Sequence, residues 1–367
     1  MKRPTWRIVV LGLSITSSWG NGHATTYRAL LRELAGRGHD LLFLERDVEW
    51  HASNRDLPQP KFCRVGLYET LAQLKARHGD EIRRADVVVI GSYLNEGITV
   101  AEWVMRRASG LVAFYDIDAP VTLSLLEQGQ NEYLSQTLIP RFGLYLSLTG
   151  GPVLTRLERE FGSPRARALY SSADPSKYFP EKIEKRWDLG YLGRYSRDRH
   201  PGLERLLIEP AQTWSAGRFV VAGPQFPESI RWPENIERIE QLGPDEHRSF
   251  YNEQRCTLNV TRAQMVKAGF SPAVRLFEAA ACGAAIVSDY WPGLETLFVP
   301  GEEILIGRSA GDVLSILRDT PERKLRQMGE QARRRFLAEH TSAHRAVEFE
   351  NHVLEAISRP TNSAVAA

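Results

Sequence analysis

A single acidic residue stands inside an otherwise apolar segment of helical character. Glu278 lies among Ala, Leu, Phe and Cys, between Pro272, which can open a helix, and Gly283, which can end one in a left-handed cap. Because a buried carboxylate is costly without a partner, we expect Glu278 to have one. A carboxylate can accept hydrogen bonds from both hydroxyls of a ribose diol. The alternative is a glutamate at the solvent edge of its helix.

The residues after this helix indicate what kind of unit contains it. Ala284–Ser288 is a short apolar run typical of a buried strand, and Asp289–Gly293 carries turn residues. Helix, glycine, strand and turn make half of a doubly wound α/β unit, in which ligands bind at the carboxyl ends of the strands. The pattern therefore predicts a ligand site in the C-terminal half of the chain.

The same stretch carries a family resemblance. The run from Arg275 to Gly283, followed by Ser288-Asp289 and Pro300–Ile304, resembles the donor-site region of glycosyltransferases with the two-domain B fold, GT-B. It is most similar there to the group 1 glycosyl transferases and the spore-maturation (CgeB-like) proteins. The resemblance implies that Glu278 binds the ribose of a nucleotide-sugar. Retaining members often carry a second glutamate eight residues earlier, where this chain has Phe270.

Length and composition limit the other possibilities. The chain has 367 residues, 43% hydrophobic and 25% charged, which suits a soluble protein with more than one core. A net charge of +2 gives no argument for nucleic acid, and no run approaches the ~20 apolar residues of a transmembrane helix. Cys63, Cys256 and Cys282 lack metal-ligand spacing and are expected to be free thiols in a reducing, cytoplasmic compartment.

A strand–loop–helix–strand unit begins the N-terminal half. Arg7–Leu13 is a continuous apolar run, the stripe from Tyr27 to Leu34 predicts an amphipathic helix, and Leu41–Glu45 predicts a second strand. Further apolar runs predict more strands, which are Ala85–Gly91, Leu111–Tyr115, Leu144–Leu148 and Ala166–Tyr170. The N-terminal half is therefore predicted to be a doubly wound domain.

The loop before the first helix carries Gly20, Asn21, Gly22 and His23. Gly20 and Gly22, with Glu45 at the end of the next strand, suggest a dinucleotide fingerprint, in which the acidic residue holds a ribose. That interpretation would make the protein a NAD-dependent oxidoreductase. The third glycine of the fingerprint is absent, and the loop is longer than its tight turn.

The same loop also resembles the first loop and helix of GT-B glycosyltransferases, where it lines the acceptor side of the cleft. In several inverting members a histidine here is the general base, a role that the resemblance implies for His23. The positive end of a helix favours a neutral imidazole, which can accept a proton from an acceptor hydroxyl. Alternatively, His23 caps the helix or contacts a phosphate.

Two carboxylates follow a neighbouring strand. Asp116 and Asp118 come at the end of Leu111–Tyr115, so they should face the same side as His23. Either could bind a sugar hydroxyl or orient the histidine, and the alternative is that they cap the next helix. Their spacing also fits an Asp-x-Asp metal pair, but they lie outside the domain expected to hold a donor diphosphate. No metal is therefore expected.

Glycines and cations follow the strands of the C-terminal half. Arg194 comes directly after the strand Trp187–Gly193, and Gly223 ends the strand Arg218–Gly223. Glycine lets a backbone approach a diphosphate, and arginine offers a forked pair of donors, although a solvated basic turn is the alternative. Ser271 and the helix start that follows it form a second anion candidate, to which Arg275 could add charge unless it forms a salt bridge on the helix face. The predicted nucleotide-side residues are Arg194, Gly223, Asn259, Arg262, Ser271, Arg275 and Glu278.

These features together predict an α/β protein of two Rossmann-like doubly wound domains facing a cleft. Residues 1–172 form the acceptor domain, 173–340 the donor domain, and 341–367 a helix that crosses back, plus a frayed tail. The expected activity transfers a sugar from a UDP- or dTDP-sugar to an unidentified small molecule, glycan or protein. Arginines and helix ends, rather than a metal or cofactor, would stabilise the leaving group. The alternatives are the oxidoreductase and a GT-B relative that only binds sugar or nucleotide.

Overall fold

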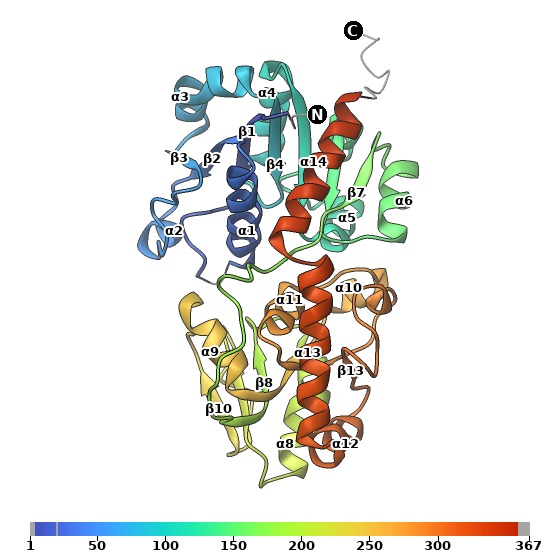
Figure 1. Ribbon diagram of the computed structural model, residues 1–367. Coiled ribbons are helices and arrows are strands. Elements are labelled where there is room, and N and C mark those ends of the chain that lie inside the picture. Colours follow the sequence, from blue (N-terminus) through green and yellow to red (C-terminus); the bar gives the residue numbers. More distant parts are fainter. Residues whose placement is uncertain (1–3, 20, 359–367) are drawn as a thin grey trace. The chain divides into compact units, whose positions relative to one another are not determined.

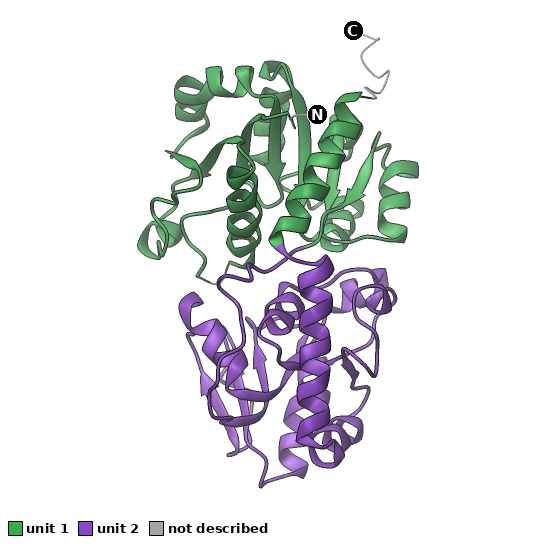
Figure 2. Ribbon diagram, viewed as in Figure 1, with its two compact units in different colours: residues 1–170, 342–367 green, residues 171–341 purple. Residues whose placement is uncertain are grey.

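The computed structural model of the protein describes residues 4–19 and 21–358. The chain forms two compact units, shown in Figure 2. Unit 1 contains Met1–Tyr170 and Ser342–Ala367, and unit 2 contains Ser171–Thr341. Two expectations from the sequence, a role for Gly20 and a frayed tail after Pro360, concern positions outside the described residues.

Unit 1 is built on a parallel sheet with helices packed on it (Figure 1). Its strands lie in the order β3-β2-β1-β4-β5-β6-β7. The strands are β1 (Arg7–Gly12), β2 (Asp40–Arg46), β3 (Arg64–Tyr68), β4 (Val87–Gly91), β5 (Leu111–Asp116), β6 (Leu144–Ser147) and β7 (Ala166–Ala168). The helices are α1 (Gly22–Gly36), α2 (Glu49–Ser53), α3 (Leu71–Arg84), α4 (Gly97–Arg107), α5 (Ala119–Glu127), η1 (Gln136–Arg141), α6 (Pro152–Arg159) and α14 (Ser342–Ser358).

Unit 2 repeats this plan with a second parallel sheet, in the order β10-β9-β8-β11-β12-β13. Its strands are β8 (Trp187–Leu192), β9 (Phe219–Ala222), β10 (Ile236–Ile239), β11 (Gln254–Asn259), β12 (Ala285–Ser288) and β13 (Leu305–Ile306). Its helices are α7 (His200–Leu203), η2 (Glu204–Ile208), α8 (Glu209–Thr213), η3 (Pro244–Glu246), α9 (His247–Asn252), α10 (Ala263–Ala268), α11 (Val274–Ala281), η4 (Leu294–Thr296), α12 (Ala310–Asp319) and α13 (Glu322–Glu339). The prediction of two doubly wound α/β units is confirmed.

Each sheet has one place where the winding reverses. In unit 1, β1 leads outward to β2 and β3, whereas β4 leads to β5, β6 and β7 on the other side. In unit 2 the same reversal falls between β8 and β11. At such a switch point the connections leave in opposite directions and open a crevice outside the carboxyl ends of the two strands. The fold therefore gives each unit one favoured place for a ligand.

Several element boundaries differ from the expectation. Helix α11 begins at Val274, not at Pro272, because Ala273 has extended backbone angles and ends the loop before it. The strands β3 and β10 were not predicted. Both lie on an outer edge of their sheet, and their exposed or half-buried residues break the continuous apolar run that marks a central strand.

The final helix completes the core of unit 1. Phe349 and Val353 of α14 belong to the same buried apolar cluster as residues of β1 and α1. Glu350 on this helix accepts two hydrogen bonds from the Arg37 guanidinium, at 2.5 and 2.6 Å, and lies 3.0 Å from Nε2 of His39. Because Nδ1 of His39 accepts the Trp6 N–H, the ring proton is on Nε2 and is donated to Glu350. An ion-paired carboxylate therefore ties the last helix to the first.

Replacing Glu350 with Gln should destabilise unit 1 by about 2–3 kcal/mol, because the half-buried guanidinium of Arg37 loses its charged partner. Burial would raise the pKa of Glu350, but the hydrogen bonds from Arg37 and His39 outweigh it and lower the pKa. The contribution of the carboxylate is therefore present above the ordinary glutamate range and is lost as the pH falls through it. Urea unfolding at pH 7 and pH 4 measures both effects. Glu132→Gln, on an exposed loop, is the control; equal losses for both variants would contradict the assignment.

Candidate functional site

Arg275 spans the switch point of unit 2. Its Nε donates to the carbonyl oxygen of Leu192 at the end of β8, at 2.6 Å. Its Nη1 donates to Oδ1 of Asn259 at the end of β11, at 3.1 Å, and its guanidinium lies 4.8 Å from the ring centroid of Tyr191. One buried side chain therefore joins the two strands at the point where they diverge. Its remaining nitrogen, Nη2, lies against Gly193.

A second polar network holds the neighbouring strand end. The side chain of Asn259 is fully buried and donates to Ser288 Oγ on β12. The carboxylate of Asp289 accepts the backbone N–H and the hydroxyl of Thr261, at 3.0 and 2.9 Å. Burial raises the pKa of Asp289, while these hydrogen bonds and the charge of Arg275 oppose the rise. Asn259 and Arg275, predicted as donor ligands, are thus engaged in positioning strand ends, and a donor contact stays a prediction for both.

The backbone turns after β8 and β9 lie in close contact. Gly223 has a φ of +133°, and a Cβ added to it would lie 2.3 Å from the carbonyl oxygen of Gly193. A side chain at Gly223 would therefore force the two turns apart. The predicted importance of a glycine here follows from this contact between two chain segments, whereas its contact with a ligand remains a prediction.

Helix α11 starts beside these turns without a side-chain cap. The loop before it is held in an uncommon conformation, with φ of 68° at Gly269 and 47° at Phe270. The N–H of Phe270 donates to the carbonyl of Pro292 at 2.7 Å, and its ring fills the space beside Gly293. A bulky residue with positive φ is strained, and such strain is typical of functional loops. Ser271 follows in this loop and is buried. An uncapped helix start of this kind can bind an anion.

Two of the arginines predicted to bind the donor, Arg194 and Arg262, differ in whether a carboxylate of the described residues pairs with them. Arg262 donates from Nε to Asp198 at 3.1 Å, so much of its charge is compensated. Arg194 is exposed directly after Gly193, and among the described residues no carboxylate pairs with its guanidinium. Since Gly193 touches Arg275 on the first turn of α11, Arg194 and the helix start belong to the same edge of the sheet.

Glu278 is buried, with only 4% of its surface exposed, so the alternative of a solvent-edge glutamate is wrong. Its Oε2 accepts the hydroxyl of Tyr251 at 2.8 Å, and the hydroxyl of Tyr178 also bonds to it. Burial, followed by the nearby Glu278, raises the pKa of both tyrosines, which keeps the phenols protonated as donors. A carboxylate offers about four lone-pair directions, so two phenols leave acceptor capacity for a further hydroxyl. No sequence pattern indicated that either tyrosine would contact Glu278.

In unit 1, Glu45, which the dinucleotide alternative assigned to a ribose, binds the loop after β1 instead. Glu45 is fully buried, and its oxygens accept four hydrogen bonds from the loop after β1. The donors are the hydroxyl of Ser14, the backbone N–H of Ile15, and the backbone N–H and hydroxyl of Thr16. A carboxylate saturated by its own loop does not offer itself to a ribose, so the structure does not favour the oxidoreductase.

The start of α1 brings the predicted base close to an aromatic residue. Asn21 caps the helix by accepting the N–H of His23 at 3.1 Å, and Gly22 is its first residue. The ring of His23 lies 5.4 Å from that of Tyr93, centroid to centroid, and the Tyr93 hydroxyl donates to Asp118 at 2.9 Å. Tyr93 therefore contacts both predicted catalytic residues. With a φ of 62° it is also a strained, non-glycine residue.

Asp116 differs from Asp118 in its surroundings. It is fully buried and accepts hydrogen bonds from the Tyr145 hydroxyl, the Thr122 hydroxyl and the N–H of Asp118, at 2.6, 2.9 and 3.0 Å. Burial raises its pKa to about 6 despite these donors. The structure therefore makes Asp116 a core residue that orders the turn of Asp118, and a direct contact with a ligand remains only a prediction.

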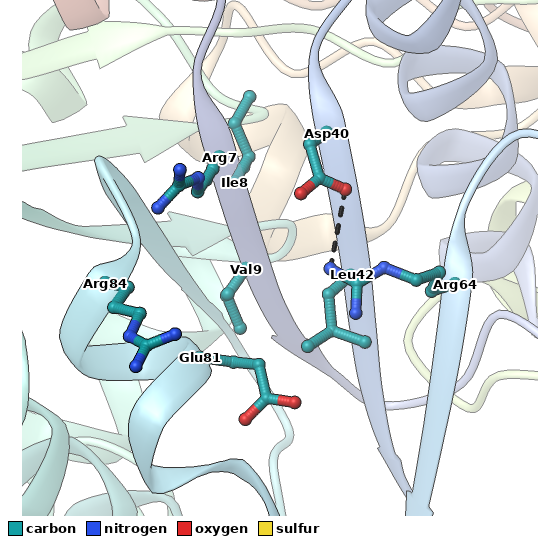
Figure 3. Close-up of a pocket in the computed structure, with 8 residues that line it drawn as sticks. All are labelled: Arg7, Ile8, Val9, Asp40, Leu42, Arg64, Glu81 and Arg84. Carbon is teal, nitrogen blue, oxygen red and sulfur yellow. Dashed lines mark hydrogen bonds and ion pairs between the residues drawn. The ribbon is translucent and has the colours of Figure 1, made fainter.

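A pocket of about 250 Å³ lies at the amino ends of the strands of the unit 1 sheet (Figure 3). Arg7, Asp40 and Arg64 are the first residues of β1, β2 and β3, and an ion pair of 3.4 Å joins the last two. Ligands of parallel sheets bind at the carboxyl ends, so this pocket is apart from the predicted site. Within the described ranges, no cluster of acidic, His or Cys side chains is arranged to hold a metal, and no helix is long and apolar enough to cross a membrane.

Comparison with known proteins agrees with this architecture. Residues 197–351, which include Arg275 and Glu278, match the family described as glycosyl transferase-like. The strand-end candidates after β11 and the helix α11 thus lie within the stretch that matches this family. No curated protein sequence matches the chain.

Solved structures of the same fold cover nearly the whole chain. Sucrose-phosphate synthase of Thermosynechococcus elongatus matches with a TM-score of 0.70 and 14% identity, over 96% of this chain and 99% of that one. HepE of Anabaena, in complex with UDP and glucose, matches with a TM-score of 0.69 and 12% identity, over 95% and 100%. An alpha-glucosyltransferase in complex with UDP and a 13-mer DNA matches equally, at 0.69 and 12%, over 95% and 99%. The predicted GT-B fold is confirmed; the CgeB-like subgroup stays a prediction.

Replacing Arg275 with Lys should lower the stability of unit 2 by about 2–4 kcal/mol, because a lysine cannot donate to two strands from one rigid fork. Thermal unfolding followed by circular dichroism measures the loss. Arg318→Lys, on the exposed face of α12, is the matched control and should leave the midpoint unchanged. Identical midpoints for the two variants would show that Arg275 does not hold the strand ends.

Replacing Asp116 with Asn should flatten the pH dependence of stability. With its pKa raised to about 6, the native carboxyl keeps a proton that the unfolded chain has already released. The free energy of unfolding of the wild type should therefore decrease by on the order of 2–3 kcal/mol as the pH rises from about 4 to about 6. The variant should lack this decrease. Urea unfolding at half-unit pH steps tests it. Parallel curves for the two proteins would contradict the raised pKa.

Proposed function

We propose that the protein transfers a sugar from a nucleotide-diphosphate sugar to a hydroxyl of an acceptor, with the donor bound in unit 2. The observation that carries the proposal is the edge of the unit 2 sheet. There the uncapped start of α11 and the Arg275 guanidinium, both within the residues that match the glycosyl transferase-like family, lie beside the Gly193 turn. That combination suits two phosphoryl groups approached by backbone and by charge.

The leaving group is a nucleoside diphosphate, whose charge grows as the sugar departs. Donors aimed at this charge accelerate the reaction most when they are already in place. Arg194 and the N–H groups of the α11 start provide this charge stabilisation, with Ser271 beside them. In this proposal the cations replace a metal, and neither a metal nor a bound cofactor takes part.

The nucleoside is a uridine, held by Glu278 through both hydroxyls of its ribose, or a thymidine, held through the single 3′-hydroxyl of its deoxyribose. The two tyrosines orient the carboxylate, and its remaining lone pairs accept the ribose hydroxyls. The bound UDP of HepE and of the alpha-glucosyltransferase supports uridine as the first base to test.

Unit 1 handles the acceptor. The acceptor oxygen bonds to the anomeric carbon, the bond from that carbon to the diphosphate oxygen breaks, and the diphosphate leaves with the electron pair. The acceptor proton passes to a base, for which His23 is the candidate, with Tyr93 and Asp118 fixing its surroundings. Asn21 and Gly22 shape the same loop.

Calorimetry with UDP, dTDP and GDP tests the donor site. UDP should bind the wild type, and Arg194→Ala should weaken it about 10-fold or more, as expected for loss of one charged contact of roughly 1.4–3 kcal/mol. Glu278→Gln should weaken UDP to a similar extent, and EDTA should change nothing. Arg318→Ala is the control. No detectable nucleotide binding to the folded wild type would reject the proposal, and binding without any turnover of UDP-sugar would leave a catalytically silent binding protein.

A further inference from the structure

A small pocket lies at the carboxyl edge of the unit 1 sheet. Its volume is about 120 Å³. Its walls come from the carboxyl ends of two adjacent strands, β1 and β2, and from the segments that follow β1, β2 and β4. The lining residues are Gly12, Leu13, Arg46, Val48, His51, Leu94 and Asn95. We refer to it as the switch-point pocket, because Gly12 ends β1 and Leu94 follows β4, the two strands where the winding of this sheet reverses.

His51 is the unusual member of this wall. Its side chain is 7% exposed, yet no described residue forms a hydrogen bond with either ring nitrogen. Nδ1 is sealed from solvent, so Nε2 is the atom through which the ring can meet a ligand. Buried polar groups in native proteins nearly always have a partner, because an unpaired one costs about 1–3 kcal/mol. Nδ1 stays unpaired within the chain, whereas Nε2 reaches the pocket and is free to form a hydrogen bond with a molecule bound there.

The charges around His51 keep its ring neutral. Burial lowers the pKa of His51, and Arg55 lowers it further, while Glu45 and Asp47 oppose the change. Glu45 is saturated by its own loop, and Asp47 pairs with Arg55 at 2.6 Å. A neutral imidazole both donates and accepts hydrogen bonds, depending on its tautomer, which suits a hydroxyl group.

The other polar groups of the wall argue against an anion as the ligand. The guanidinium of Arg46 is paired with Glu96 at 2.7 Å and also donates to the carbonyl of Glu69. Asn95 is exposed and carries an uncharged amide. The pocket thus offers a neutral imidazole, an amide and apolar surface from Leu13 and Leu94. Such a wall suits a hydroxylated carbon skeleton.

The volume of the pocket limits the size of the ligand that it can hold. A cavity of about 150 Å³ can hold a benzene-sized ring, and each water takes about 30 Å³ in the liquid. The switch-point pocket, at about 120 Å³, therefore has room for most of one small ring or a short polyol, and a nucleotide is too large for it. Trp50, on the same short helix as His51, exposes a flat aromatic surface nearby.

We infer that the switch-point pocket binds one sugar ring or polyol group of the acceptor, and that Nε2 of His51 forms a hydrogen bond with one of its hydroxyls. The inference rests on the proposed function, since it assigns the acceptor a chemical class, a hydroxylated ring. It makes His51 a binding residue, distinct from the proton acceptor proposed at His23.

The test uses the full chain labelled with ¹³C at histidine Cε1, observed by NMR at pH 7.5. The signal of His51 is assigned by its loss in His51→Gln. D-glucose, myo-inositol and glycerol are titrated separately to 50 mM. We expect at least one of them to shift the His51 signal saturably, with half-saturation in the millimolar range. No saturable shift with any of the three would overturn the inference.

Two variants and one separate measurement complete the test. Asn95→Trp should fill the pocket from its exposed rim and abolish the shift, whereas Glu132→Trp, on an exposed loop, should leave it unchanged. A shift that persists in Asn95→Trp would also overturn the inference. UDP affinity, measured by calorimetry, should stay within twofold in His51→Gln and Asn95→Trp. If the wild type does not bind UDP, the donor proposal is rejected, but the result for the His51 signal is unaffected. The two failures are therefore distinguishable.

Discussion

The contact of one guanidinium with two strand ends determines the geometry of unit 2. Arg275 holds the end of β8 through a carbonyl and the end of β11 through an amide, at the point where the sheet would otherwise open. An arginine in that place also brings positive charge without exposing it to solvent. Its helix begins one residue earlier, so the same side chain fixes the direction of an uncapped helix start. Strand spacing, charge and helix position are thus set together, and any phosphate-binding role of this edge depends on them.

Unit 1 uses the opposite charge for a related purpose. Glu45 binds the loop after β1 through four hydrogen bonds, which shapes the approach to α1 and to His23. Both buried ions are satisfied by backbone and neutral side-chain groups near a switch point. A buried charge whose partners are all supplied by the chain orders the segments around it, and removing those partners would leave it unpaired. Order at the two edges therefore comes from the protein itself, before any ligand binds.

The sequence was informative where local pattern and burial agree. Apolar runs such as Val87–Gly91 are central strands, and the resemblance around Glu278 led to the correct fold. Edge strands β3 and β10 were missed because half-exposed strands lack such runs. The partners of Glu278 were also missed, since Tyr178 and Tyr251 lie far away in the sequence and no spacing rule connects them. Asp116 and Asp118 look equivalent in sequence, but only the fold shows that one is sealed in the core.

The path of the chain has a consequence for how the protein is made. Unit 1 contains residues that precede and residues that follow unit 2 in the sequence. Phe349 and Val353 of α14, which come last, are part of the apolar core of unit 1. During synthesis the first 170 residues must wait, with that core uncovered, until the ribosome has produced all of unit 2. Unit 2 is one continuous stretch of the sequence, so it can fold as soon as it has left the ribosome. Early nascent chains should therefore depend on chaperones more than the finished protein does.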